Sequence, residues 1–323
     1  MIALVVSTLL TLVVLPGLAL YWVTRPPSSL LYWGAKVGAV GVYTLATFYL
    51  GGWHMVSYYA RFGLLAVFGV VALVGAWRMR GRALWVRPQG WQWIGLGSAV
   101  LLVALSTALL TRVYSADQVP PDPVDLTFPL KDGRFYVASG GSTPLMNPHM
   151  TVDAPTHRKW RGQRWALDLV ELYSSGNRAR GLYPTDLDRF AIFGTPVYAP
   201  CDGPVDALAD TYPDLVPPNR DTTHKAGNYV LLRCATDAYV LLAHLKHGSI
   251  VVTEGDTVAA GDLLGEVGNS GNSWEPHLHI HAQRGRGEAT VLDADPRPMT
   301  FHGRYPVRND VLSETAGLGQ SPM

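Results

Sequence analysis

The chain has 323 residues, which is room for about two domains, and its formal net charge at pH 7 is +1. This small value hides an asymmetry, because Asp117 is the first of the 25 acidic residues. The sequence has no basic terminal arm or long polybasic run, so its charge does not point to a nucleic-acid partner.

Apolar runs in the first 112 residues predict a membrane domain. Residues 2–23 are free of charge and long enough to cross a bilayer core at ~1.5 Å per residue. The run lacks the basic start and cleavage site of a signal peptide. Arg61 would lie inside the third span unless that helix begins later. We therefore expect a four-helix anchor over residues 1–112, with spans at residues 2–23, 37–53, 55–77 and 93–111.

Basic residues orient these helices. They flank the first loop and fill the third, at Arg25, Lys36, Arg78, Arg80, Arg82 and Arg87. The positive-inside rule places both loops in the cytoplasm. Because four spans return the chain to its starting side, we expect everything after Arg112 to lie outside the cytoplasm. The spans contain no acidic residue from which to build an ion path, so an anchor is favoured over a sensor or scaffold.

The remainder predicts a mostly β domain at residues 126–309, between a Pro-rich linker (113–125) and a mobile polar tail (310–323). Insertions at 173–193 and 208–226 have the composition of loops that rim a groove. Short runs with strand periodicity are separated by turn residues, and in the third of them Trp165, Leu167 and Leu169 would share one face. These runs are residues 127–130, 134–138, 164–172, 196–199, 229–233 and 239–243.

Only two cysteines occur, Cys201 and Cys234, and they are too far apart in sequence for a CxxC motif. They are either two buried thiols or one disulfide. A location outside the cytoplasm favours the disulfide.

The most informative stretch is residues 265–281, GEVGNSGNSWEPHLHIH. If a strand begins at Pro276, then His277, His279 and His281 share one side of it and the intervening apolar residues face the core. Two imidazoles with this spacing suit a zinc site, in which one binds metal and the other handles a proton. A histidine-rich surface strand is the alternative.

Three blocks occur in order: RWALD, YVLLAHL and GDTVAAGDLLGEVGNSGNSWEPHLHIH. Together they resemble the lysostaphin-type zinc endopeptidases of bacterial cell walls, over residues 126–283. The resemblance implies an all-β fold of the duplicated hybrid motif type, with two antiparallel sheets and a groove on one face. It also implies that Asp168 and His279 bind zinc, that His277 is the general base, and that His244 stabilises the oxyanion.

One family position differs. The first zinc histidine of the family stands four residues before the aspartate, where this chain has Arg164, and a guanidinium cannot bind zinc. His149 is our first candidate for the replacement, because a subgroup with a similar block carries an upstream Asn-x-His. His157 and His224 rank second and third. His281 shares the face of the pair, but the family has no ligand at that position.

These observations predict a multi-pass protein of the bacterial inner membrane whose periplasmic zinc endopeptidase domain hydrolyses stem or cross-bridge peptides of peptidoglycan. The expected partners are these peptides, the lipid bilayer and other cell-wall proteins. The alternative is a non-catalytic domain of the same fold that binds wall peptides or activates a separate hydrolase.

Overall fold

The computed structural model describes residues 2–25, 27–235 and 237–313. The chain divides into two compact units, Met1–Tyr114 and Ser115–Met323, close to the boundary predicted at residue 112. The first unit is helical and the second is mostly β.

Among the residues that the structure describes, three stretches are long and apolar enough to cross a membrane: Ala3–Thr24, Ala60–Arg78 and Trp91–Asp117. The elements of the helical unit are α1 (Ile2–Leu9), a π-helical turn (Leu10–Val14), α2 (Leu15–Thr24), α3 (Leu30–Leu50), a 3-10 turn (Trp53–Met55), α4 (Ala60–Arg78) and α5 (Trp91–Tyr114). Helix α3 has 21 residues but is not one of the three apolar stretches found. The fourth predicted span therefore stays a prediction.

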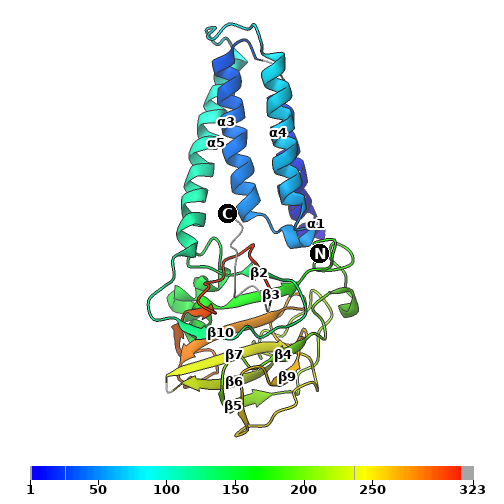
Figure 1. Cartoon of the computed structure of the whole chain (residues 1–323), viewed down its shortest axis with the longest axis vertical. Coiled ribbons are helices and arrows are strands. Elements are labelled where there is room, and N and C mark those ends of the chain that lie inside the picture. Colours follow the sequence, from blue (N-terminus) through cyan, green and yellow to red (C-terminus); the bar gives the residue numbers. More distant parts are fainter. Residues whose placement is uncertain (1, 26, 236, 314–323) are drawn as a thin grey trace. The chain divides into compact units, whose positions relative to one another are not determined.

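Hydrogen bonds join the first and third loops of the helical unit. The amides of Leu30 and Leu31 donate to the carbonyls of Ala83 and Leu84, each at 3.1 Å. The Lys36 ammonium donates to the carbonyl of Arg25 at 2.8 Å. The two basic loops therefore lie at the same end of this unit (Figure 1).

Arg61 lies in the first turn of α4, because that helix begins at Ala60 rather than at residue 55. Its guanidinium donates to the hydroxyl of Tyr58 at 3.1 Å. The same group lies 4.4 Å from the centroids of the Phe48 and Tyr58 rings. Of the two expectations for Arg61, the structure shows the later start of the helix.

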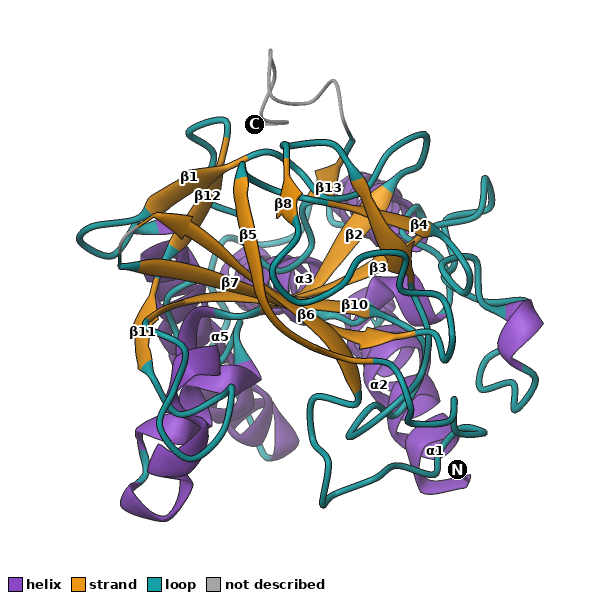
Figure 2. Ribbon diagram, turned by 90° about the horizontal axis from the view of Figure 1, so that it is seen from below, coloured by secondary structure: helices purple, strands orange, loops and turns teal. Residues whose placement is uncertain are grey.

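The β unit contains a large sheet in the order β13-β2-β3-β10-β7-β6-β5-β8, with β11 also paired to β10. Figures 1 and 2 show its central strands side by side. Its strands are β2 (Phe135–Ser139), β3 (Leu167–Glu171), β5 (Gly203–Ala209), β6 (Asn228–Ala235), β7 (Ala238–Leu245), β8 (Thr257–Val258), β10 (Leu278–Arg284), β11 (Asp295–Arg297) and β13 (Val311–Leu312). Two further pairs are β1 (Val124–Leu126) with β12 (Met299–Phe301), and β4 (Pro196–Tyr198) with β9 (Leu263–Glu266).

The mostly β prediction is confirmed, with three corrections. The described residues of the unit form one nine-stranded sheet and two small pairs rather than two sheets, and the β1–β12 pair is parallel. Residues 127–130 form no strand, although Phe128 and Leu130 are buried. Arg164 and Trp165 end a 3-10 helix (Pro155–Trp165), because the Ala166 amide bonds back to Gln163 and the extended strand starts only at Leu167.

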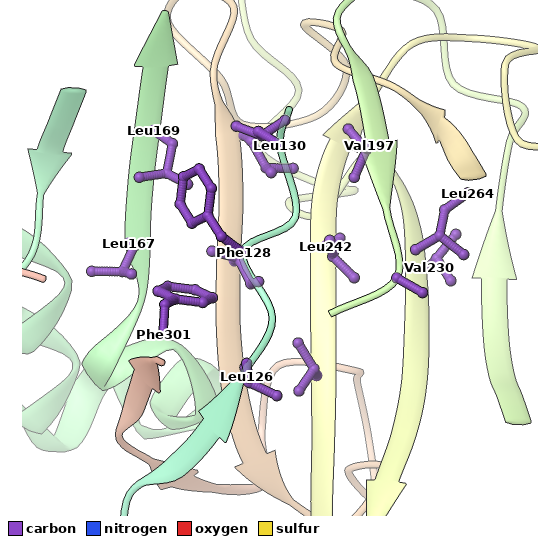
Figure 3. Close-up of a cluster of buried hydrophobic side chains, with 14 of the residues drawn as sticks. Leu126, Phe128, Leu130, Leu167, Leu169, Val197, Val230, Leu242, Leu264 and Phe301 are labelled. Atoms are coloured by element: carbon purple, nitrogen blue, oxygen red, sulfur yellow. The ribbon is translucent and has the colours of Figure 1, made fainter. Parts of the chain in front are cut away.

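One face of the large sheet packs against the β4–β9 pair and the segment that contains Phe128 and Leu130 (Figure 3). Leu278, Ile280 and Ala282 of β10 belong to this core. Because strand side chains alternate, His279 and His281 point to the opposite face, as predicted. The core therefore fixes which side of the sheet carries the histidines.

The ends of the β unit differ from expectation. Part of the predicted linker belongs to the unit, since residues 124–126 form β1 and Asp122 pairs with Arg284 and Arg297. The predicted tail begins with a strand, β13, which pairs with β2. Its last part, residues 314–323, lies outside the described residues.

Cys201 and Cys234 form a disulfide, with their Cα atoms 5.6 Å apart. The bond joins Cys201, two residues before β5, to Cys234 near the end of β6. The disulfide alternative is confirmed.

Candidate metal centre

Three adjacent strands bring the central side chains together. In the sheet register, His279 of β10 lies opposite Asp168 of β3 on one side and opposite Ala243 of β7 on the other. Facing residues in a sheet have Cβ atoms about 5 Å apart. Register alone therefore places Asp168 beside His279 and brings the end of β7 close to both.

His244 reaches this face through a β-bulge. Strict alternation along β7 would put His244 on the core face with Val240 and Leu242. Instead His244 has a positive φ of 64°, the pairing with β6 shifts at this point, and Leu245 takes the next core position. A bulge of this kind re-aims one side chain. The His244 ring consequently lies 4.8 Å, centroid to centroid, from that of His277.

His149 is placed over Asp168 by Asn147, which is fully buried. The Asn147 side chain accepts a bond from the His149 amide at 3.2 Å and donates to the carbonyl of Ala166 at 3.0 Å, just before β3. This ties the 3-10 helix Pro148–Asp153 to the start of the Asp168 strand. His149 Nε2 then lies 2.9 Å from Asp168 Oδ2.

A buried chain of hydrogen bonds fixes the tautomer of His279. The Gln283 amide donates to the carbonyl of Gly285, so its oxygen faces His281 Nε2, which must carry a proton. His281 Nδ1 is then an acceptor, 3.0 Å from His279 Nε2, which carries the next proton. His279 Nδ1 is therefore a bare lone pair, 3.1 Å from Asp168 Oδ1. Two acceptors this close together need a cation between them.

His277 and His244 have matching orientations. His277 Nδ1 donates to the carbonyl of Glu275 at 2.8 Å, and His244 Nδ1 donates to that of Ser270 at 2.9 Å. In the neutral ring, Nε2 is left as an acceptor. His277 Nε2 lies 3.5 Å from Asp168 Oδ1. Each ring is thus held to accept a proton, or to bind a metal, at Nε2.

A buried arginine supports the segment that holds His277. Arg178 is 1% exposed and donates from Nε and from Nη2 to the two carboxylate oxygens of Glu275, each at 2.6 Å. This two-point contact connects the predicted insertion at 173–193 to the residue whose carbonyl holds His277. Sequence reasoning found neither Arg178 nor Glu275, because no local motif links residues 97 positions apart.

Burial and neighbouring charges shift the pKa values of the clustered residues in different directions. Burial alone would raise the pKa of Asp168, but the imidazoles of His149 and His277 outweigh it and hold that pKa well below its usual range. Burial lowers the pKa of His279 to about 4 and that of His244 well below its ordinary value. Burial also acts to lower the pKa of His277, but the Asp168 carboxylate raises it overall. The cluster therefore offers a carboxylate at Asp168 and neutral imidazoles at His244 and His279, which are forms that bind metal, whereas the raised pKa of His277 favours its protonated form.

Two overlapping groups could hold a metal ion, one formed by His149, Asp168 and His279, the other by His244, His277 and His279. Within each group the donor atoms lie within 4.8 Å of one another. Nitrogen and carboxylate donors in threes suit Zn²⁺ with an open position. His279 is common to both groups, and its unprotonated Nδ1, which faces Asp168, makes the donor set of the group with His149 and Asp168 fit such an ion.

The cavity above these side chains has a volume of about 510 Å³. All five predicted site residues, His149, Asp168, His244, His277 and His279, line it. His281 lies beneath them as a fully buried supporting residue.

The remaining candidates point elsewhere. Arg164 pairs with Asp153 at 2.9 Å. His157 is exposed and contacts the Thr151 carbonyl, while His224 pairs with Asp221 and lines a neighbouring cavity of about 360 Å³. Of the three replacement histidines considered, His149 is the one that the fold brings to Asp168.

Residues 185–291 match the family model described as Peptidase family M23. This match agrees with the expected resemblance over these residues, which include His244, His277 and His279 but not His149 or Asp168. The chain is 31% identical over 150 residues to the peptidoglycan DD-endopeptidase ShyA of Vibrio cholerae, covering 46% of this chain and 30% of that protein. It is 36% identical over 86 residues to an uncharacterized metalloprotease of Haemophilus influenzae, covering 27% and 15%. The chain thus spans less than a third of the length of either relative.

Solved structures with similarity include the catalytic domain of lysostaphin from Staphylococcus simulans, at 22% identity and a TM-score of 0.25, covering 36% of this chain and 84% of that one. A zinc-containing peptidase from Vibrio cholerae matches at 20% identity and a TM-score of 0.24, covering 41% and 50%.

Proposed function

We propose that this chain is a membrane-anchored, zinc-dependent endopeptidase that hydrolyses peptide bonds in peptidoglycan. The observation that carries the proposal is the Asp168 carboxylate, contacted by His149 Nε2 and His279 Nδ1 and flanked by two further imidazoles at the base of a cavity. The M23 match over the second half of the cluster supports the same reaction class.

His149, Asp168 and His279 would hold the metal. A zinc ion held by these three residues would supply Lewis-acid chemistry for the peptide carbonyl and for the attacking water. The protein contributes a carboxylate and two imidazoles, and it orients His279 through the chain of His281 and Gln283.

His277 and His244 would handle protons. His277 Nε2 accepts the proton of the attacking water and returns it to the leaving amine, while the bond from Nδ1 to the Glu275 carbonyl keeps the ring in place. His244 donates to the developing oxyanion from Nε2 only when it carries a second proton, because Nδ1 already donates to Ser270. The lowered pKa of His244 favours the neutral ring, in which Nε2 is an acceptor, so the oxyanion role requires His244 to gain a proton during the reaction.

The substrate follows from the relative and from the expected location. ShyA is named a peptidoglycan DD-endopeptidase, and we propose that this chain cleaves a peptide bond of the same polymer. The basic loops at one end of the helical unit support their placement in the cytoplasm and that of the β unit in the periplasm. Other cell-wall proteins remain proposed partners.

Four crossings are supported by the course of the helical unit. Since the first and third loops lie at the same end, α3 must run back along the unit before α4 returns. Its buried residues include Lys36, Ala39 and Thr44, so neighbouring helices shield its less apolar side chains. A shielded central helix needs less apolar surface than one that faces lipid.

The test measures bound zinc per chain in the purified full-length protein, by elemental analysis. We expect about one zinc in the wild type and its loss in His149→Ala, because that substitution removes one of three protein ligands. His157→Ala is the matched control, since His157 is an exposed histidine outside the cluster, and it should keep the metal.

Zinc retained in His149→Ala but lost in His244→Ala would assign the metal to the second histidine group instead. Wild-type protein that takes up no zinc under loading conditions would overturn the peptidase proposal. With metal present, release of new amines from purified peptidoglycan, absent in His277→Ala, would establish the reaction.

A further inference from the structure

The charged side chains that line the cavity differ in whether they have partners. Asp168 is engaged by the site histidines and Glu275 by Arg178. The two cations of the lining, Arg220 and Lys225, form no ion pair with any residue that the structure describes. Asp221, the acid next to Arg220, pairs with His224 and accepts a hydrogen bond from the Thr223 amide. The cavity rim therefore carries positive charge that the protein does not neutralise.

Both cations rest on indole rings. The Arg220 guanidinium carbon lies 4.0 Å from the Trp274 ring centroid, and Lys225 Nζ lies 4.1 Å from that of Trp160. A cation over a ring face is oriented but keeps its N–H donors available. Trp274 is itself 50% exposed and lines the cavity with Arg220. The two cations are thus positioned for a ligand, and no carboxylate among the described residues pairs with them.

Like charges gather at this rim. Burial, followed by the nearby charges of Arg220 and Lys159, lowers the pKa of Lys225. Lys225 also lies where the cavity over the metal centre meets the neighbouring one, since Lys225, Ala226 and Leu292 line both. An extended chain that follows the two hollows would pass this ammonium.

We propose that Arg220 and Lys225 form a carboxylate-binding subsite that holds an acidic peptide in the cavity beside His277 and His279. The planar guanidinium fits a carboxylate with two parallel hydrogen bonds, and the ammonium adds a second charge. The buried Asn272 Oδ1, which lines the same cavity without a hydrogen-bond partner among the described residues, is an acceptor for a peptide N–H. The subsite rests on the proposed function, and it specifies the substrate as a peptide with a carboxylate near the cleaved bond.

The test uses fluorescently labelled, uncross-linked stem tetrapeptides, which lack the cross-link bond, and measures their binding to the full-length protein by anisotropy at low salt. One peptide keeps all carboxylates, a second has its C-terminal carboxylate amidated, and a third has its side-chain carboxylates amidated. The wild type should bind the first peptide at least about tenfold more tightly than one of the amidated forms, as expected for charge-assisted hydrogen bonds. The weaker form identifies which carboxylate is held.

The variant with both Arg220→Gln and Lys225→Gln should lose this preference and bind all three peptides within about twofold. Arg233→Gln is the matched control, because Arg233 is an exposed arginine of β6 that does not line the cavity, and it should keep the preference. Equal wild-type binding of all three peptides, or an unchanged preference in the double variant, would overturn the subsite. Neither result depends on hydrolysis, so the peptidase proposal stands or falls separately on the zinc and amine-release measurements.

Discussion

At the scale of single residues, the supporting partners of the centre determine the chemistry as much as the ligands do. His281 occupies a position where no metal ligand was expected, and it is buried without access to solvent. Its place between His279 and Gln283 sets which nitrogen of His279 carries the proton. Such outer partners raise metal affinity by holding the ligand in one tautomer and orientation.

The variant His281→Phe should lower zinc affinity by roughly 10–100-fold, because the proton on His279 Nε2 loses its acceptor. Competition against a chelator of known affinity measures the change. Arg164→Gln alters the residue at the usual ligand position of the family and should leave affinity unchanged. Wild-type affinity in His281→Phe would show that the buried chain does not orient His279.

The sequence pointed to the candidate ligand residues that the fold brings together but not to the residues that support them. His149 could be proposed because Arg164 left a vacancy in the expected pattern and an Asn-x-His motif lay upstream. The contacts of Asn147, Arg178 and Glu275 join segments that are distant in sequence and meet only in the folded chain. No spacing of residues in the sequence therefore predicts these contacts. The same is true of Arg220 and Lys225, which stand in a segment predicted only to rim a groove.

At the scale of elements, the alternation of apolar and polar residues predicted which side chains of β10 face the core, but it did not predict the orientation of His244 at the end of β7. Period-two patterning assumes an unbroken ladder, so it cannot reveal the extra residue at His244 whose positive φ turns the ring to the site face. It also extended β3 backwards through Arg164 and Trp165, where local i to i+3 bonds make a 3-10 helix. Strand centres are fixed by burial, whereas strand ends depend on bonds that patterning does not report.

Strand β3 offers a stability test at Glu171, whose pKa is raised by burial and only partly lowered by the hydroxyl of Thr195. A raised folded-state pKa means that the native state binds the proton more tightly than the unfolded state. The contribution of Glu171 is therefore favourable at low pH and is lost as the pH rises from about 4.5 through the folded-state pKa. Glu171→Gln should raise the melting temperature at pH 7.

The gain from Glu171→Gln should vanish near pH 4, where the wild-type carboxyl is protonated in both states. Melting of the full-length protein in detergent at the two pH values measures it. Glu254→Gln, an exposed carboxyl of a turn, serves as the control and should show no comparable pH-dependent gain. An equal change in melting temperature at both pH values would mean that ionisation of Glu171 does not destabilise the folded protein.

At the scale of the whole molecule, the composition of the chain changes near residue 112, and the structure divides into two compact units after Tyr114. Acid-free apolar helices bury little of their own surface, as the exposed Leu, Val and Trp side chains of α4 and α5 show. The β unit has its own core and a disulfide. Apolar surface that the chain does not cover is what a membrane-facing helix requires.

Replacing both cysteines (Cys201→Ser with Cys234→Ser) should destabilise the β unit by about 3–4 kcal/mol, the loop-closure estimate for a separation of this length. Urea unfolding followed by tryptophan fluorescence measures the loss. Treating the wild type with reductant should reproduce it, and the same treatment should leave the double variant unchanged. Free thiols in non-reduced protein purified from the membrane would contradict the proposed oxidising location.

The disulfide also encloses a particular part of the chain. Its 33-residue separation contains β5, the segment that carries Arg220 and Lys225, and nearly all of β6. A protease that cuts the exposed part of this segment would leave the two fragments covalently joined, and the nicked protein would run as one chain until reduced. The segment that carries Arg220 and Lys225 can therefore be cut while both fragments stay attached to each other. Comparing reducing and non-reducing gels of the same digest would distinguish an intact segment from a cut one.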